Sequence, residues 1–506
     1  MMRKIRQAFS ALFLLLLAVS ACAAGRKAEA TSLKDMAITS VELSLQEVKM
    51  LTIGASSQSL FLGSGSSPDD EIKRAAVQDC EMLFKYTVEQ LNESLTLLNK
   101  SEQWKKDQVE DVQTWLSASL TDQVTCIEGF KGVKDDYAES VRNISKLISD
   151  SLAIVNSLPV ASISPGGQKK RRLLASVDSE LYFPSWLSLA DRRLLQSSPA
   201  GGVSANVVVA KDGTGNYRTV SEAVKAAPSY SDSRYVIHVK AGVYAESVDV
   251  SKDNIMLVGD GKYSTVVTGS SHGGSIQSVA TFAATGKGFI ARDMGFENTA
   301  GSDAGPAIAL RVSSDLSAFY RCSMKGYQDT LYAYSQRQFY RECDISGTVD
   351  FIFGDAAAVF QSCNILSRNR DGGNANYITA QGRSDLNQNT GFSIQNCQVS
   401  AESIRTYLGR PWREYSRTVF MQSFLDANVD PAGWAEWSGN FGLKTLYYGE
   451  YMNSGPGAGI AKRIQWPGYH IISTVAEAIR FTVAEFISGN EWLPSTGVAF
   501  QSGLGR

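Results

Sequence analysis

Histidine is scarce in this sequence, whose 506 residues contain three: His238, His272 and His470. The seven cysteines include no Cys-x-x-Cys pair, a common spacing of zinc ligands. Acidic and basic residues nearly cancel, which leaves a formal net charge of −2. We therefore expect no metal site and no nucleic-acid partner bound through a basic surface.

Long apolar runs are almost absent, and the one that exists lies at the N-terminus. Arg3, Lys4 and Arg6 precede about a dozen apolar residues, and small residues follow at 21–24. This layout predicts a cleaved signal peptide over residues 1–24, since the run is short for a membrane span. We expect a secreted, extracellular protein with no membrane segment in its mature form. A retained N-terminal anchor is the alternative.

Residues 31–158 follow a helical period, with apolar residues at steps of three and four. Pro68 is the only proline between the signal and Pro159, which suits a four-helix bundle. No cluster of ionisable residues here looks catalytic, so we predict a folding, inhibitory or interaction domain. Three glycosylation sequons fit an exposed surface of a secreted protein, at Asn92, Asn99 and Asn143.

Six cysteines remain once Cys22 leaves with the signal peptide. An even number in an oxidising compartment favours disulfides. Cys80 and Cys126 lie on separate expected helices, so a disulfide between them would join these helices.

Residues 159–204 have the composition of a linker, rich in proline, glycine and serine. Two basic clusters, Lys169–Arg172 and Arg192–Arg193, are each followed by Leu-Leu. Basic pairs in an exposed flexible linker are accessible to proteolysis, so we expect a processing protease as a partner. Solvated charge without processing is the alternative.

Residues 205–506 are predicted to form an all-β domain, because short runs of Val, Ile, Phe, Tyr and Thr are broken by Gly, Asn and Asp. One short helix is expected at "VSEAVKAAP". The runs "FYRC", "FYREC" and "VFQSC" end at Cys322, Cys343 and Cys363, which are 21 and 20 residues apart. A period of about 20 residues indicates a solenoid of stacked parallel strands, that is, a parallel β-helix.

Asp329 and Asp350 each lie seven residues after a cysteine of this repeat, Cys322 and Cys343. Equal offsets in successive coils predict two carboxylates in contact on adjacent strands. One should keep its proton while the other stays ionised, so that one attacks and the other donates a proton. Gln328, next to Asp329, offers an amide donor for an oxyanion. A purely structural pair of turn aspartates is the alternative.

Four segments resemble, in this order, the signature segments of plant pectin methylesterases. They are "GVYAE" (242–246), "GYQDTLY" (326–332), "GTVDFIFG" (347–354) and "YLGRPWREYSR" (407–417). The segment "TWLSASLTDQVTCIEGF" is similar to the inhibitor domain that precedes the enzyme in larger plant members. The N-terminal cysteine hairpin typical of free inhibitors is missing. The RRLL pairs resemble the processing sites of the family.

The resemblance implies a right-handed parallel β-helix that hydrolyses methyl esters of cell-wall pectin (homogalacturonan), with no metal or organic cofactor. It implies that Asp329 is the proton donor and Asp350 the nucleophile. It also implies that Arg410 keeps the nucleophile ionised and that Trp412 lies in the sugar-binding cleft. The inhibitor-like pro-domain is expected as a partner within the same chain.

The resemblance further implies a disulfide between Cys343 and Cys363. Their separation by one coil favours the same pair. Cys322 and Cys397 are left without an assigned partner.

Two positions depart from the family pattern on the side where substrate binds. "PAIALR" (306–311) stands in place of QAVALR, so Pro306 replaces a glutamine that stabilises the oxyanion together with the counterpart of Gln328. Proline has neither a side-chain amide nor a backbone N–H, and loss of one oxyanion donor costs about 10²–10³ in turnover. "GSIQS" (274–278) stands in place of GSTTF, so Ile276 replaces a cleft threonine. We therefore expect reduced activity.

Three alternatives remain open at this stage. A catalytically impaired homologue would bind pectin or inhibit without turnover. A β-helical glycoside hydrolase would also use two carboxylates about 5 Å apart, although Gln328 and Arg410 favour ester hydrolysis. "GSSHG" (269–273) with His470 has the spacing of a serine-esterase elbow, but lacks the expected strand–turn–helix context.

Overall fold

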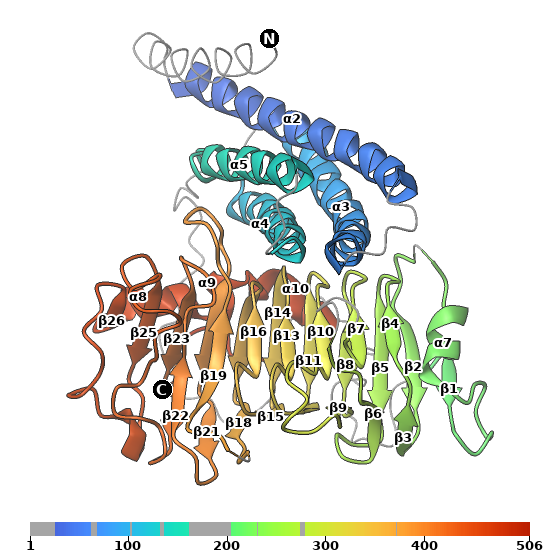
Figure 1. Ribbon diagram of the computed structural model, residues 1–506, viewed down its shortest axis with the longest axis vertical. Helices are drawn as coiled ribbons and strands as arrows, with labels where there is room; N and C mark the ends of the chain where they lie inside the picture. Colours follow the sequence, from blue (N-terminus) through green and yellow to red (C-terminus); the bar gives the residue numbers. More distant parts are fainter. Residues whose placement is uncertain are drawn as a thin grey trace, which may run out of the picture.

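The computed structural model describes residues 26–61, 68–101, 104–131, 136–160, 204–229, 231–273, 279–370 and 372–505. Figure 1 shows two parts, a group of helices and a long array of parallel strands beneath it. The predicted signal peptide, both RRLL sites and Ile276 lie outside the described residues. In the described ranges, no helix combines the length and apolar character needed to cross a membrane.

The N-terminal part, called the helical domain here, contains four helices, as predicted. They are α2 (Arg26–Phe61), α3 (Pro68–Lys100), α4 (Lys106–Gly129) and α5 (Asp136–Asn156). Their inward faces share an apolar core that includes Phe84, Leu116 and Ile148. The three sequon asparagines, Asn92, Asn99 and Asn143, are exposed.

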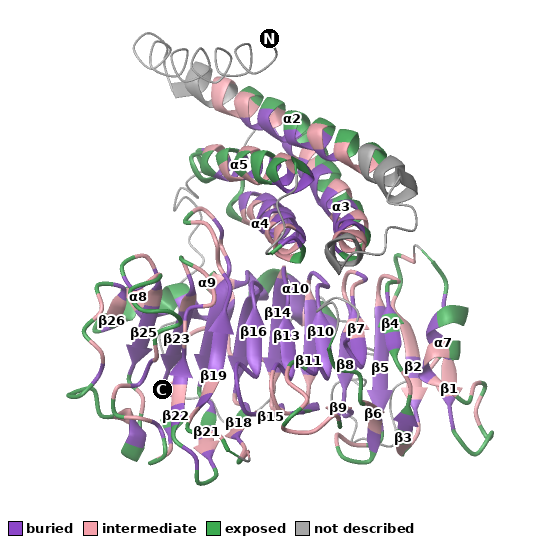
Figure 2. Ribbon diagram, viewed as in Figure 1, coloured by how far each residue is buried: buried purple, intermediate pink, exposed green. Residues whose placement is uncertain are grey.

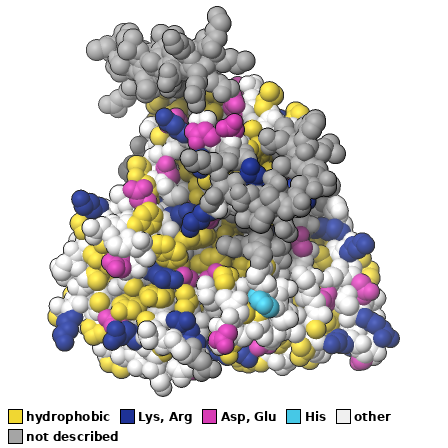
Figure 3. Space-filling view, viewed as in Figure 1, with side chains coloured by type: hydrophobic (Ala, Val, Ile, Leu, Met, Phe, Trp, Pro, Cys, Tyr) yellow, Lys and Arg dark blue, Asp and Glu magenta, His cyan; other side chains and the backbone are white. Residues whose placement is uncertain are grey.

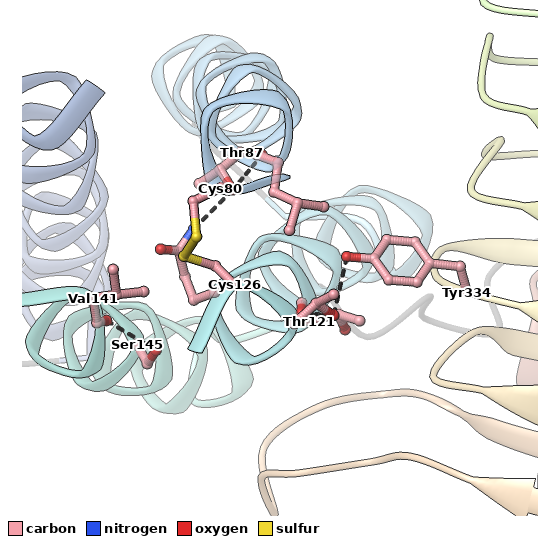
Figure 4. The surroundings of a disulfide bond; sticks show 10 residues. Cys80, Thr87, Thr121, Cys126, Val141, Ser145 and Tyr334 are labelled. Atoms are coloured by element: carbon pink, nitrogen blue, oxygen red, sulfur yellow. Dashed lines mark hydrogen bonds between the residues drawn. A yellow bond between two sulfur atoms is a disulfide. The ribbon is translucent and has the colours of Figure 1, made fainter. Parts of the chain in front are cut away.

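A disulfide between Cys80 and Cys126 joins α3 to α4, with 4.9 Å between the two Cα atoms (Figure 4). The expected link between these two helices is therefore present. It fixes α4, the helix that faces the strands of the second part.

The second part is a β-helix of three sheets in which the described strand pairs are parallel. The eleven-stranded sheet contains β1 (Val207–Val209), β2 (Tyr235–Val239), β5 (Ile255–Gly259), β8 (Ile290–Arg292), β11 (Ser317–Tyr320), β14 (Arg337–Arg341), β17 (Ala357–Gln361), β20 (Gly391–Gln395), β23 (Arg417–Met421), β25 (Tyr447–Tyr451) and β26 (Tyr469–Ile471). The seven-stranded sheet contains β22 (Thr406–Gly409), β19 (Asn376–Gln381), β16 (Ile352–Gly354), β13 (Leu331–Ala333), β10 (Leu310–Val312), β7 (Phe282–Ala284) and β4 (Val248–Val250). The eight-stranded sheet contains β24 (Phe424–Leu425), β21 (Gln398–Ala401), β18 (Asn364–Ser367), β15 (Asp344–Gly347), β12 (Ser323–Lys325), β9 (Gly295–Asn298), β6 (Thr265–Gly269) and β3 (Gly242–Ala245).

Each complete coil gives one strand to each sheet, the coils at the two ends contribute to fewer sheets, and successive coils are in register. Leu331 on β13 pairs with Ile352 on β16, so the predicted spacing of 21 residues is one full coil. Inside the β-helix, equivalent aromatic residues stack along the axis: the rings of Phe319, Tyr340 and Phe360 have centroid separations of 4.9 and 4.7 Å. The predicted solenoid is therefore confirmed, and its buried strands form one continuous core (Figure 2).

Short helices cover parts of the β-helix surface. The predicted early helix is α7 (Val220–Ala226), capped by the Thr219 side chain, which accepts a hydrogen bond from the Glu222 N–H. No sequence pattern predicted α8 (Val475–Ala478), α9 (Val483–Phe486) and α10 (Gly489–Thr496), because helices of four to eight residues are too short to show a period. These helices cover the apolar outer face of the eleven-stranded sheet, where Trp492 packs in one cluster with Phe339.

The predicted disulfide between Cys343 and Cys363 is wrong, because both are free and buried thiols. They belong to a ladder of four thiols at equivalent positions of consecutive coils, with Cys322 before them and Cys397 after them. The backbone N–H of Cys363 donates to the Cys397 sulfur at 3.4 Å. Each inner cysteine thus has a neighbouring thiol on both sides, so spacing alone does not select one pair.

Candidate active site

The two predicted aspartates lie on adjacent coils, each just before a strand of the seven-stranded sheet. Asp329 precedes β13 and Asp350 precedes β16, in the same register. Both have left-handed backbone conformations, with φ of 60° and 52°, which aspartate tolerates better than most residues. Their exposed fractions are 8% and 5%. The local backbone therefore brings together two nearly buried carboxylates.

Arg410 holds one of these carboxylates. It follows β22, and its Nε and Nη2 atoms donate to the two Asp350 carboxylate oxygens at 2.9 and 2.7 Å. The guanidinium carbon also lies 4.1 Å from the centroid of the Tyr377 ring and 4.5 Å from that of Trp437. The bidentate contact with Asp350 and the two aromatic rings beside the guanidinium together hold Arg410 in place.

The two carboxylates differ in their electrostatic surroundings. Burial, and then the charge of Asp350, hold the pKa of Asp329 well above its usual range, with Arg410 opposing this effect. Burial also raises the pKa of Asp350, but the hydrogen bonds and charge of Arg410 lower it in turn. Asp329 is therefore the more readily protonated of the two and Asp350 the more readily ionised, a difference suited to an acid and a nucleophile.

Gln328, the predicted oxyanion donor, and Pro306, which replaces the second donor of the family pattern, lie one coil apart. The backbone N–H of Ala307 donates to the Gln328 carbonyl at 3.2 Å, which places Pro306 beside the coil that carries Gln328. Among the described contacts, the Gln328 side-chain amide has no hydrogen-bond partner, so it can donate to a bound group. Pro306 is exposed and has no N–H to add.

Aromatic side chains form a surface next to the carboxylates. The Tyr332 and Phe353 rings stack at 4.2 Å, three residues after Asp329 and Asp350 respectively. The Trp412 ring lies 5.9 Å from Phe353 and 6.4 Å from Tyr332. Such an aromatic surface suits a pyranose ring, and the place of Trp412 in a sugar-binding cleft stays a prediction.

A glycine allows Trp412 to occupy this place. A Cβ atom at Gly382 would lie 2.9 Å from the Trp412 indole. Any larger residue would therefore displace the tryptophan from the aromatic surface.

The helical domain covers this aromatic surface. Tyr332, Tyr334 and Trp412 belong to one apolar cluster with residues of the helical domain. The Tyr334 hydroxyl donates to Asp122 of α4 at 2.7 Å, and Figure 4 shows its ring directed at this helix. The Thr121 hydroxyl of α4 donates to Asp355 of the β-helix at 2.7 Å. Helix α4 therefore lies directly against the aromatic surface.

Several of these residues were missed from the sequence. Tyr377 lies one coil after Asp350, in the register that pairs Ile352 with Thr379. This coil is longer than the repeat of 20 or 21 residues, so extending the repeat would not have found Tyr377. Trp437 lies in a loop with no repeat, and no sequence signal identified it.

On the face seen in Figure 3, basic and acidic side chains are interspersed without separating into regions of one sign.

The serine-esterase interpretation does not fit the fold. Ser271 follows β6, whereas His470 is on β26, at the opposite end of the array of strands (Figure 1). The His470 ring stacks on Tyr447 instead, with centroids 4.3 Å apart.

Two family models match the chain. The pectinesterase model matches residues 206–490, and the plant invertase/pectin methylesterase inhibitor model matches residues 18–154. The chain is 45% identical to probable pectinesterase/pectinesterase inhibitor 32 of Arabidopsis thaliana, over 99% of this chain and 100% of that protein. It is 46% identical to pectinesterase 2 of Citrus sinensis, over 95% and 91% of the two chains.

Solved structures agree with these relatives. Pectin methylesterase from carrot is 53% identical, with a TM-score of 0.59, and covers 60% of this chain and 100% of its own. The enzyme from Aspergillus niger is 30% identical, with a TM-score of 0.53, and covers 60% and 99%. These matches identify the second part as a right-handed parallel β-helix. The chain belongs to the pectinesterase family, and carries an inhibitor-family helical domain ahead of the catalytic one.

Proposed function

We propose that this pectinesterase hydrolyses methyl esters of cell-wall homogalacturonan through Asp350 and Asp329. The observation that supports this most is the bidentate contact of Arg410 with Asp350, beside a second carboxylate that lacks such a contact among the described residues. An Asp350 oxygen attacks the ester carbonyl carbon, and the Gln328 amide donates to the oxyanion that forms. The oxyanion collapses and the bond to the methoxy oxygen breaks. Asp329 gives its proton to that oxygen, so methanol leaves.

The second half of the reaction restores the enzyme. Water attacks the acyl group carried by Asp350 and gives a proton to Asp329. The bond to Asp350 breaks, which frees a galacturonic acid unit and the ionised Asp350; the new acid then loses its proton to water. Atoms and charges balance over the cycle, in which one ester and one water become one acid and methanol.

Pro306 supports a second candidate, an impaired homologue that binds pectin with little turnover. It stands where the family pattern has an oxyanion-stabilising glutamine, and it contributes no donor. The glycoside hydrolase alternative is not favoured, because the family and the solved relatives are ester hydrolases.

We further propose that the protein is secreted and stays latent until its linker is cut. The contacts of α4 with Tyr334 and Asp355 support latency, since they cover the aromatic surface beside the carboxylates. The basic clusters of the linker support cleavage by a protease that recognises basic pairs. The signal-like N-terminus, the three exposed sequon asparagines and the pectin substrate support a location in the cell wall.

Methanol release from pectin tests the proposal, measured on the full chain before and after the linker is cut. Wild type should release methanol after cutting, and Asp350→Asn should release none, because an amide of the same shape cannot attack. Asp260→Asn is the matched control: Asp260 pairs with His238, far from the site, and the same chemical change there should leave the rate unaltered. New reducing ends without methanol would establish a glycosidase. Binding of pectin without methanol would establish the impaired homologue.

A further inference from the structure

Three basic side chains of the β-helix pair with carboxylates of the helical domain. These pairs are Lys287 with Glu93, Arg337 with Asp111, and Arg413 with Glu128. The basic side chains differ in the carboxylate partners that they would keep if the helical domain dissociated. Arg337 keeps a bidentate contact with Asp315 of the β-helix, at 3.0 and 2.7 Å, so its charge stays neutralised. Arg413, among the described ion pairs, has Glu128 as its partner and no carboxylate of the β-helix.

Arg413 lies at the edge of the aromatic surface of the candidate active site. It follows Trp412 directly, and its guanidinium carbon lies 5.0 Å from the centroid of that ring. Trp412 in turn packs with Phe353, three residues beyond Asp350. A sugar stacked on Trp412 would therefore lie between the catalytic carboxylates and the Arg413 charge. Arg410 serves such a sugar less freely, because its Nε and Nη2 atoms already donate to Asp350.

The position of Glu128 is not explained by the stability of its own helix. It lies in the last turn of α4, where the helix dipole disfavours a negative charge. The ion pair with Arg413 is also partly exposed, with exposed fractions of 31% for the Glu128 side chain and 23% for that of Arg413. Partly exposed pairs of this kind contribute little to stability. The position of Glu128 is instead notable for its chemistry: its carboxylate, from the helical domain, pairs with Arg413 at the edge of the aromatic surface.

We propose that Arg413 binds a free carboxylate of a galacturonate unit packed at Trp412, and that Glu128 occupies this place in the latent protein. This inference rests on the proposed function and names a preference within it. A guanidinium makes short, charge-assisted hydrogen bonds to a carboxylate, whereas a methyl ester is neutral and offers weaker acceptors. Arg413 therefore makes the enzyme favour pectin that is already partly de-esterified.

Binding and kinetics of three arginine variants test this preference. Wild type, Arg413→Gln, Arg413→Lys and the control Arg405→Gln are purified as full chains, with a protease recognition sequence inserted after Gln196. The linker is cut after folding, and the helical domain is removed by ion exchange. The carrot relative supports handling this part alone, since its whole chain matches 60% of this one. Arg405 is a suitable control because its side chain is 63% exposed and pairs with Asp430 of the β-helix.

Arg413→Gln should bind polygalacturonate roughly tenfold more weakly than wild type, with unchanged binding of fully methylated pectin. On partly de-esterified pectin its KM should rise by a similar factor while kcat stays constant. Arg413→Lys should recover part of the loss, and Arg405→Gln should match wild type. Equal losses on both polymers, or no loss on either, would overturn the proposal. If wild type releases no methanol at all, the proposed function fails, yet polygalacturonate binding by Arg413→Gln still decides the role of this arginine.

Discussion

Arg410 donates two hydrogen bonds to Asp350, at 2.9 and 2.7 Å, and reaches Asp329 only through its charge. Two chemically identical side chains, one coil apart, thereby become different. Burial raises the pKa of both carboxyls, and Arg410 opposes this rise mainly at Asp350. The direction of proton transfer in the proposed reaction depends on this single asymmetric contact.

Arg410→Lys should therefore reduce turnover strongly. Lysine keeps a positive charge but cannot form the parallel pair of hydrogen bonds, so Asp350 loses orientation and part of its ionisation. We expect kcat to fall by about 10²-fold, comparable to the loss of one positioned donor. Single-turnover methanol release separates this effect from binding, since KM should change far less. Arg405→Lys, a surface control, should behave as wild type. An Arg410→Lys enzyme with full kcat would exclude the proposed role of this contact.

The pH dependence of kcat/KM should be bell-shaped, with both limits set by the aspartates. Asp350 must be ionised, so activity is lost as pH falls through its raised pKa. Asp329 must be protonated, so activity is lost as pH rises through its own pKa, which lies well above the ordinary 3.8. Arg410→Lys should move the acidic limit to higher pH, because the group that lowers the Asp350 pKa is weakened. The limits are properties of the coupled pair. An acidic limit that stays in place in this variant would contradict the assignment of Asp350.

Much of this arrangement could be predicted from the sequence, because a β-helix repeats at fixed length. The spacing of Cys322 and Cys343 gave the coil length, and the coil length gave the pairing of Asp329 with Asp350. Trp437 could not be found this way, since it lies in a loop outside the repeat. The same regularity misled the disulfide prediction: Cys343 lies one period from both Cys322 and Cys363, so the period alone selects no pair, and all of these thiols are free.

The docking of the helical domain was beyond prediction for a different reason. It depends on hydrogen bonds between residues more than 200 positions apart, such as that between Tyr334 and Asp122. Neither residue has any distinctive local pattern. Only the folded surfaces bring them together, on a face of α4 that also makes polar contacts with the β-helix through Thr114, Ser117 and Thr121.

Docking of the helical domain should weaken as pH rises. Burial raises the pKa of Asp122 from 3.8 to about 8, against hydrogen bonds from Tyr334 and Thr87 and the charge of Arg311. The docked state therefore holds a proton that water-exposed Asp122 would release. Its contribution to docking is fully present below the ordinary pKa and is lost as pH rises through about 8. Size-exclusion chromatography of the cut protein should show the two parts together at acidic pH and separating above this range.

Asp122→Asn provides the control for this prediction. An amide can keep hydrogen bonds in the same place but does not ionise, so docking should lose much of its pH dependence. The variant should remain docked above the pH at which wild type separates. Separation of both proteins at the same pH would assign the effect to other buried acids of the interface, such as Asp355, whose pKa is also raised by burial.

The replacement at Pro306 gives the prediction that bears most on activity. If the missing amide is the principal defect, Pro306→Gln should raise kcat by up to about 10²-fold, with a smaller change in KM, because an oxyanion donor acts in the transition state. The exposed position of Pro306 beside the Gln328 coil leaves room for the longer side chain. Pro306→Ala is the matched control: it restores the backbone N–H without the amide and should gain little if the side chain is what matters. If Ile276 is the larger defect, only Pro306→Gln combined with Ile276→Thr should recover turnover. A wild-type rate that Pro306→Gln leaves unchanged, together with brisk methanol release, would mean that water or a neighbouring group already supplies the second donor.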